Sequence, residues 1–196
     1  ALAIGKEVRE RSAHAPREHA ERLLPMIEAL LGEAGMAPRG LDAVAFGRGP
    51  GAFTGLRIAA AVSQGLALAW GLPVIPVSSL AALAQRSPER KVLAAMDARM
   101  GEVYWGAFVR ARPLGEEGVY APERIPLPPG GDWWGVGSGW KRHAPSLERR
   151  LEGKVKGWED AHPRACEIAL LAPLFPAVAP EEALPVYVRN QVVRKG

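Results

Sequence analysis

A glycine-rich segment contains the residues of this sequence that are best suited to bind an anion. The run GRGPGAFTG at 47–55 follows an apolar stretch, 41–46, and precedes a helical pattern of small residues, 58–70. Glycine permits backbone angles that a Cβ forbids and allows another group to approach closely. A helix N-terminus offers free N–H groups and a positive dipole end to a phosphate. The candidate phosphate-binding residues are Gly49, Gly51, Thr54 and Gly55, and Thr54 is the expected helix N-cap.

A turn that packs against its own domain explains the same segment equally well. No Gly-Lys-Ser/Thr follows it, as a Walker A loop requires. Its glycine spacing also differs from the G-x-G-x-x-G pattern of dinucleotide-binding folds. The segment by itself therefore does not decide between an enzyme and a protein that is the partner of one.

The other reactive side chains form no catalytic pattern. His14 and His19 are five residues apart, which does not place them on one helical face, and the sequence around His19 lacks the second histidine of a zincin motif. Cys166 lies within an apolar pattern and is expected to be a small buried residue. Asp97 begins the segment 97–101, whose composition favours a hairpin turn over a metal-binding role. We therefore expect no catalytic residue, no metal and no cofactor.

Several motifs together connect this chain to a known family. They are the run 47–83, the segments DAR at 97–99 and EVYW at 102–105, the pair 16–19 and 23–26, and PVYVRN at 185–190. In these motifs, which span nearly the whole chain, it resembles the TsaB family, the dimerisation subunit of the bacterial machinery that makes threonylcarbamoyladenosine in tRNA. The resemblance implies an α/β fold of the actin-like ATPase class (ASKHA, ribonuclease H-like), with two lobes that each hold a mixed sheet flanked by helices.

The comparison with TsaD, the catalytic relative of TsaB, concerns two positions. In TsaD-like proteins the strand after this helix leads into Val-Asn-His-x-x-x-His, whose two histidines bind a metal. The resemblance places Ser79 and Leu83 at those positions. A serine hydroxyl is a poor ligand for a transition metal and leucine is none. The resemblance therefore implies a non-catalytic subunit that pairs with a TsaD-like protein.

The resemblance also implies that pairing uses two helices, 18–34 and 54–70. The expected contacts are His19, Leu23, Met26, Ile27 and Leu30 on the first helix, and Ile58, Ala59, Val62 and Ser63 on the second. Because each helix must bury one face internally, about half of these residues are expected to face their own sheet. Further expected partners are a TsaE-like ATPase, a second copy of the chain when it is alone, and tRNA through the complex.

Two other functions remain open. A small kinase or ATPase of the actin-like fold would use the loop 47–55, although the lysine of a P-loop is absent. Direct tRNA binding would use arginines that are scattered among acids, a pattern that favours a solvated surface over a binding stripe. These arginines are Arg86, Arg90, Arg110, Arg112, Arg149, Arg150, Arg189 and Arg194.

The hydrophobic pattern predicts how the elements are divided between the lobes. We expect an N-terminal lobe over 1–88, joined by 185–196, and a C-terminal lobe over 89–184. Members of the family begin with a strand that ends in Asp-Thr-Ser/Thr, and we expect the printed sequence to start within the second strand. The expected strands are 1–4, 7–12, 41–46, 74–77, 92–96 and 103–109. A strand and a glycine loop follow at 133–140, and the region 113–131 is expected to be irregular. The other expected helices are 80–85 and 162–175.

Composition bounds the class of protein. The 196 residues suffice for one large or two small domains, and the formal net charge is +4. A single cysteine excludes an internal disulfide and fits a reducing compartment. No run of about 18 apolar residues is present, so no membrane span is expected. We expect a cytoplasmic protein.

Overall fold

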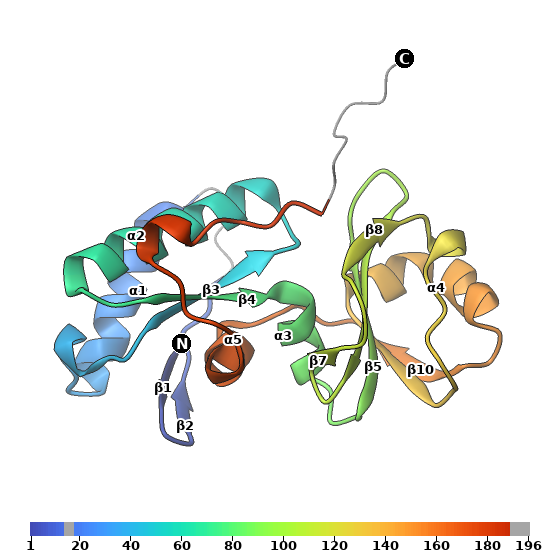
Figure 1. The fold of residues 1–196 in the computed structure, drawn as a ribbon, viewed down its shortest axis with the longest axis horizontal. Helices are drawn as coiled ribbons and strands as arrows, with labels where there is room; N and C mark the ends of the chain where they lie inside the picture. The colour runs from blue at the N-terminus through green and yellow to red at the C-terminus, as the bar shows by residue number, and fades with distance from the viewer. Residues whose placement is uncertain (14–17, 189–196) are drawn as a thin grey trace, which may run out of the picture. The chain divides into compact units, whose positions relative to one another are not determined.

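The computed structural model describes residues 1–13 and 18–188, which form two compact units. The first unit comprises Ala1–Ser78 and Arg164–Pro185, and the second comprises Ser79–Pro163 with the segment that begins at Val186 (Figure 1). The expected boundary at 88/89 differs from this division. The helix at 79–85 packs on strands of the second unit, whereas the helix at 165–171 packs on strands of the first. Most of the segment 185–196 lies outside the described residues.

The first unit is built around two parallel strands. β3 (Val44–Gly49) and β4 (Val74–Ser78) pair in parallel, and α2 (Phe53–Trp70) connects them. In Figure 1, α2 lies above this pair and α5 (Ala165–Leu171) below it. The hairpin of β1 (Leu2–Ile4) and β2 (Glu7–Arg9) forms a separate sheet. The remaining elements are α1 (His19–Glu33) and the 3-10 turns η1 (Pro38–Gly40), η3 (Ala172–Leu174) and η4 (Pro180–Glu182).

Two apolar clusters hold the first unit together. One joins Phe46 of β3 and Val74 of β4 to the alanines at 60 and 67 on the inner face of α2. The other joins Leu30 and Leu31 of α1 to Leu2, with Trp70 of α2 packed against it. Because α2 contributes small side chains, the helix can approach its strands closely. It ends at Gly71, whose φ of 68° is the left-handed conformation that favours glycine at a helix C-terminus.

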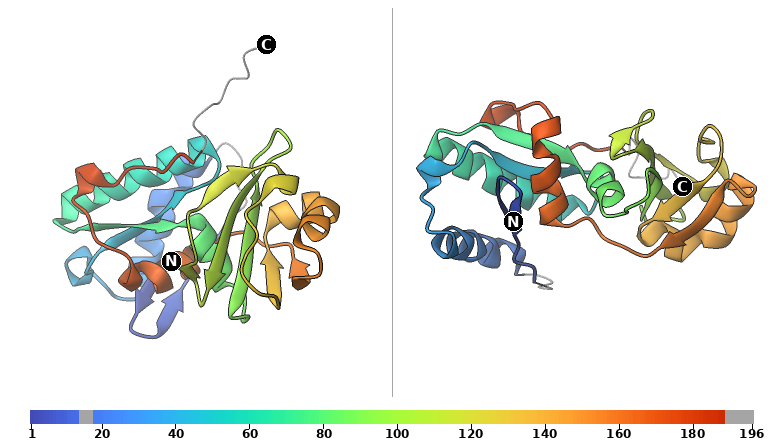
Figure 2. Two further views of the ribbon diagram at one scale, coloured as in Figure 1. Left: turned by 45° about the vertical axis from the view of Figure 1, so that its right-hand side comes forward. Right: turned by 90° about the horizontal axis from the view of Figure 1, so that it is seen from below.

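The second unit contains a mixed six-stranded sheet. The strand order is β10-β9-β5-β6-β7, and β8 also pairs with β6. β5, β9 and β10 run in parallel, whereas β6 is antiparallel to β5. α3 (Ser79–Gln85) and α4 (Ser138–Leu151) pack on opposite faces, as Figure 2 shows. The bounds are β5 Lys91–Asp97, β6 Val103–Val109, β7 Arg112–Pro113, β8 Gly118–Tyr120, β9 Trp133–Val136, β10 Val155–Glu159 and η2 Pro122–Arg124.

Three buried tryptophans form the centre of the second unit. Trp105, Trp133 and Trp140 pack with leucines of β5 and α4, and all three are at most 2% exposed. The Trp105 and Trp140 rings lie 6.1 Å apart at 44°, within the range of favourable aromatic pairs. The indole N–H of Trp140 donates to the carbonyl oxygen of Leu93 at 2.8 Å, so its polar group is paired.

The start of α4 lies very close to β5. A Cβ built on Gly137, whose φ is 122°, would lie 2.2 Å from the carbonyl oxygen of Ala95, and one on Gly139 would lie 2.9 Å from the carbonyl carbon of the same residue. Real Cβ atoms essentially never come this close. Glycine is therefore required at both positions for the helix to reach the strand.

Several sequence-based expectations need correction. The strand expected at 7–12 ends at Arg9, and the helix expected at 162–175 is the shorter α5 followed by η3. Neither α4 nor β10 was predicted. α4 contains Pro145, which cannot donate a helical hydrogen bond, and the backbone two residues earlier, at His143, has the non-helical φ of −129°.

Candidate functional site

The glycine-rich segment forms the connection from β3 to α2. β3 ends at Gly49, whose φ of 106° favours glycine, and α2 begins at Phe53 with Ala52 as its N-cap. Ala52 is extended, and its carbonyl oxygen accepts the first helical hydrogen bond from the Leu56 N–H at 3.0 Å. Thr54 is therefore not the N-cap, as the sequence suggested, because it already lies inside the first helical turn. No side chain caps this helix N-terminus.

The candidate phosphate-binding residues lie together in this connection and in the first turn of α2. Gly51 faces its own helix, because a Cβ there would lie 3.7 Å from Leu56 Cδ2, which agrees with the turn interpretation. Thr54 and Gly55 are exposed. Nearby, the Arg57 guanidinium stacks 3.8 Å from the centre of the Phe53 ring. The geometry is compatible with both interpretations, and phosphate binding stays a prediction.

α2 has two faces of small and apolar residues. Leu56, Ala60, Ser63 and Ala67 form the face that is buried in the first unit. On the opposite side, residues 55, 58, 62, 65 and 69 recur at spacings of three and four, which places them on one stripe of the helix. This outer stripe consists of Gly55, Ile58, Val62, Gly65 and Ala69. Gly55 and Gly65 have no other group within 4 Å of a Cβ built on them, so the stripe is open at both glycines.

The nine expected contact residues fall into three groups. Leu30 (5% exposed) and Ser63 (7%) are buried in the first unit, and Ile27 and Ala59 pack against its two clusters. The half-buried ones are Leu23, Met26, Ile58 and Val62. The side chain of His19 lies outside the described part of the structure.

Sequence reasoning missed several residues of this surface. Gly55, Gly65 and Ala69 complete the outer stripe, and Leu24 on α1 is 45% exposed. The spacing of three and four residues was the signal that could have identified them.

The two positions to which the resemblance assigns the metal ligands of TsaD-like proteins, Ser79 and Leu83, lie in α3. Ser79 begins this helix and Leu83 is completely buried, with its methyl group against the Gly137 backbone. Within residues 1–13 and 18–188, no three side chains of His, Cys, Asp or Glu are grouped closely enough to hold a metal ion.

Asp97 has the turn role that its sequence context predicted. Its Oδ1 accepts the backbone N–H of Arg99 at 3.1 Å, inside the hairpin connection from β5 to β6. The hydroxyl of Ser138 accepts the N–H of Asp97 at 3.2 Å, which ties the end of β5 to the start of α4. His143 Nε2 lies 3.9 Å from Asp97 Oδ1 and Arg142 lies 3.7 Å from Oδ2.

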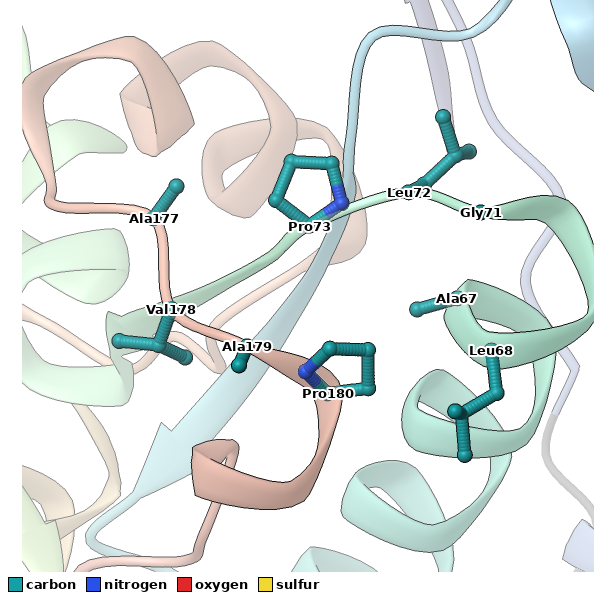
Figure 3. A pocket seen from close by; sticks show the side chains of 9 residues that line it. All are labelled: Ala67, Leu68, Gly71, Leu72, Pro73, Ala177, Val178, Ala179 and Pro180. Atoms are coloured by element: carbon teal, nitrogen blue, oxygen red, sulfur yellow. The ribbon is translucent and has the colours of Figure 1, made fainter.

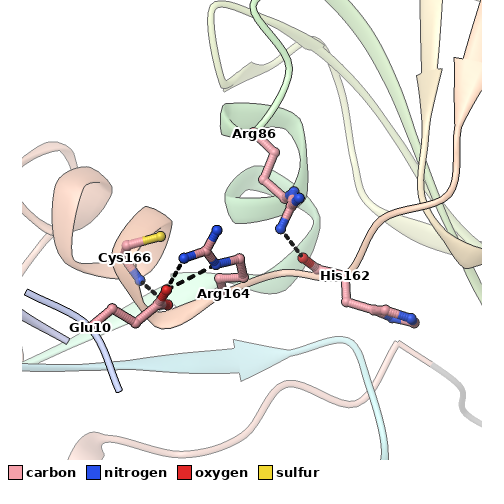
Figure 4. A network of polar contacts seen from close by, with 5 residues as sticks. All are labelled: Glu10, Arg86, His162, Arg164 and Cys166. Atoms are coloured by element: carbon pink, nitrogen blue, oxygen red, sulfur yellow. Dashed lines mark hydrogen bonds and ion pairs between the residues drawn. The ribbon is translucent and has the colours of Figure 1, made fainter. Parts of the chain in front are cut away.

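Glu10 connects the segment after β2 to the start of α5 (Figure 4). One carboxylate oxygen accepts the backbone N–H of Cys166 at 3.1 Å, and the other accepts both Nε, at 2.9 Å, and Nη2 of Arg164. Burial acts to raise the pKa of Glu10, but the bonds from Arg164 and Cys166 outweigh it and the pKa is lowered. This carboxylate therefore remains ionised and orients α5.

Cys166 is not an activated nucleophile. Burial and the neighbouring Glu167 raise the pKa of its thiol to about 11, so the thiol stays protonated near neutral pH. We expect the iodoacetamide reaction of the native protein to accelerate about tenfold per pH unit from pH 8 to 10 without a plateau. Because the chain has one cysteine, the alkylated fraction measured by mass spectrometry reports this thiol alone. Protein unfolded in guanidinium should instead level off near pH 9, and a native plateau at the same pH would contradict the assignment.

Two of the hollows that the described residues form lie on the first unit. One, of about 410 Å³, lies between the end of α2 and residues 177–180 and is lined by apolar side chains and backbone (Figure 3). The other, of about 580 Å³, is lined by Glu10–Ala13 together with Glu21, Arg22, Pro25 and Met26. Among the described helices, none is long and apolar enough to cross a membrane.

Comparison of the sequence and comparison of the structure with known proteins both point to the same protein family. A family model described as TsaD, tRNA N6-adenosine threonylcarbamoyltransferase, matches residues 11–125. The tRNA threonylcarbamoyladenosine biosynthesis protein TsaB of Escherichia coli is 39% identical, and that of Haemophilus influenzae 38%, each over 92% of this chain and 84% of the relative. A Pseudomonas aeruginosa protein of known crystal structure, described as similar to peptidase YEAZ, is 45% identical in sequence to this chain. The match covers 89% of this chain and 86% of that protein's chain, and the two structures superimpose with a TM-score of 0.80. The chain therefore belongs to the TsaB family of tRNA threonylcarbamoyladenosine biosynthesis proteins and has its actin-like, ribonuclease H-like α/β fold.

Proposed function

We propose that this chain is a non-catalytic subunit that pairs with a TsaD-like catalytic subunit through α1 and α2. Pairing would support transfer of the threonylcarbamoyl group to adenosine 37 of tRNA in the cytoplasm. The observation that carries the proposal is the outer stripe of α2, Gly55, Ile58, Val62, Gly65 and Ala69, which lies opposite the face that α2 buries in its own unit.

Small residues on this stripe favour contact with another helix. Glycine and alanine allow two helix backbones to approach closely, while Ile58 and Val62 supply apolar area at the centre of the stripe. A surface helix that is polar on its outer face needs no partner, whereas α2 has no charged residue between Arg57 and its end at Trp70.

α1 extends the same surface. It packs against α2, and its half-buried Leu23 and Met26, with the exposed Leu24, lie outside the buried group of Leu30 and Leu31. We therefore retain Leu23, Met26, Ile58 and Val62 as proposed contacts. Leu30 and Ser63 are better explained as core residues that hold the two helices in place.

The same surface supports a homodimer when the catalytic partner is absent. A patch that is apolar and rich in small residues can meet its own copy around a two-fold axis. A TsaE-like ATPase as a third component remains part of the proposal without a contact site assigned to it.

Size-exclusion chromatography with light scattering tests the proposal directly. We expect the chain and a purified TsaD-like subunit to elute together, and the chain alone to elute at twice its mass of 21.0 kDa. If both proteins are folded and elute separately at micromolar concentration, the pairing is refuted. ATP hydrolysis by the purified chain alone would contradict the non-catalytic role.

A further inference from the structure

We propose that basic residues at one end of the strands in the second-unit sheet form a contact surface for the phosphate backbone of tRNA. These residues are Arg90, Lys91, Arg110, Arg112 and Lys154. We call this surface the basic edge. The inference rests on the proposed function, because it takes tRNA as the polyanion that this complex meets. It assigns to this chain a direct contact with the substrate RNA in addition to pairing.

The strand register brings these residues to one edge. Lys91 begins β5 and is paired with Val109 at the end of β6, and Val109 in turn faces Arg112 at the start of β7. On the other side, β5 lies beside β9, and the backbone N–H of Trp133, the first residue of β9, donates to the carbonyl oxygen of Lys154 at 2.9 Å. The basic edge therefore extends across β7, β6, β5, β9 and β10 in that order (Figure 1).

The length of this row suits a nucleic-acid strand. Neighbouring strands are about 4.8 Å apart, so the row from β7 to β10 spans about 20 Å. A nucleic-acid strand presents several phosphates over that distance. A hydrogen bond also holds Arg110 beside Arg90, the residue before β5, because the backbone N–H of Arg110 donates to the carbonyl oxygen of Arg90 at 2.8 Å.

Most of the positive charge at the basic edge is not neutralised by carboxylates. Lys91 Nζ donates to the carbonyl oxygen of Gly131 at 3.1 Å and Lys154 Nζ to that of Gly130 at 2.9 Å, and both acceptors are neutral. Arg90, Arg110 and Arg112 are exposed and make no ion pair within residues 1–13 and 18–188.

Acidic side chains in the same turns reduce this charge without cancelling it. Asp132 pairs with the neighbouring Lys156 at 3.4 Å, and Glu89 and Glu152 are exposed. Counting Lys156, six basic side chains face three acidic ones at this edge. The excess of positive charge favours a polyanion over an acidic patch of a few carboxylates.

The backbone fixes Arg110 at the tip of the β6–β7 hairpin. Arg110 and Ala111 have φ of 52° and 59°, the conformation of both central residues in a type I′ turn. A test variant must therefore keep a Cβ at this position so that the turn is not altered together with the charge.

The test compares two double variants in the complex with the TsaD-like subunit. R110Q/R112Q removes two charges from the basic edge, and the control R39Q/R124Q removes two exposed arginines, from η1 and η2. Binding of an unmodified tRNA transcript is measured from 50 to 200 mM salt, after size exclusion has shown that each variant still pairs with its subunit.

We expect R110Q/R112Q to bind the transcript about tenfold more weakly than wild type, with a salt slope smaller by about two, because roughly one unit of slope is lost per phosphate contact. R39Q/R124Q should match wild type, and R110K/R112K should restore binding because a phosphate contact requires only the charge. Wild-type affinity and slope for R110Q/R112Q would overturn the inference while leaving the proposed function intact. Loss of pairing in this variant would also overturn it, by assigning the edge to protein contact. Failure of the wild-type chain to pair would instead refute the proposed function.

Discussion

A Gly65→Glu variant is expected to stay folded and to lose its pairing with the TsaD-like subunit. A Cβ at Gly65 meets no other group within 4 Å, and glycine is a poor helix former, so the substitution does not disturb the isolated chain. In the paired state the new carboxylate would be buried without a partner in the middle of the outer stripe. At a cost of about 3 kcal/mol, the dissociation constant should rise roughly a hundredfold.

Isothermal titration of the variant into the TsaD-like subunit measures this effect. The matched control is Leu174→Glu, which introduces the same charge in η3, outside α1 and α2. Leu174 is 59% exposed and is not part of the outer stripe, so this variant should bind like wild type. Equal affinities for Gly65→Glu and wild type would show that the outer stripe of α2 is not the interface.

Gly137→Ala is expected to destabilise the second unit more than any other single methyl group added there. The new Cβ would lie 2.2 Å from the Ala95 carbonyl oxygen and 2.6 Å from Leu83 Cδ2, and the φ of 122° disfavours any side chain. Overpacking and backbone strain together should cost about 4 kcal/mol in the free energy of unfolding. For a unit of this size that lowers the melting temperature by roughly 20 °C.

Gly153→Ala separates the two causes of this loss. Gly153 also has a positive φ, of 75°, but a Cβ there meets nothing within 4 Å. Calorimetry should therefore show a decrease of only about 1 kcal/mol, which is the backbone contribution alone. If both variants melt at the same temperature, the close approach of α4 to β5 does not limit stability.

Much of the fold could be predicted from local sequence. The strands β3, β5 and β6 and the helix α2 have apolar or small-residue patterns that are long and bounded by glycine or proline. β10 could not be found in this way, because its five residues include Gly157 and two charged side chains. Gly157 is needed there only because a Cβ would lie 2.7 Å from the Trp134 ring, a neighbour that the sequence does not reveal.

α4 escaped prediction for a related reason. Gly139 and Pro145 within it both argue against a helix when read locally. The helix forms because Trp140, Leu147 and Leu151 are completely buried against the sheet, which outweighs the poor local propensity. Tertiary packing of this kind is invisible in a single sequence.

The expected contacts could be assigned to two helices from the sequence, but not to the outer face of each helix. The resemblance to TsaD-like proteins implies that Ser79 and Leu83 stand at the two metal-ligand positions. Which of the nine expected contacts face outward is not evident from the sequence, because Leu30 and Ser63 follow the same helical periodicity as residues on the open side. The N-cap was misassigned at Thr54 because a hydroxyl is the usual cap, whereas here the extended backbone of Ala52 starts the helix.

The uneven distribution of tryptophan gives the chain two independent spectroscopic reporters. Five of its six tryptophans lie between Ser79 and Pro163, and three of them are completely enclosed, so indole emission follows melting of that half. The only thiol, Cys166, lies in the other half and can carry a single dye once that half opens. Recording both signals in one denaturant titration would reveal whether the halves unfold together or one after the other.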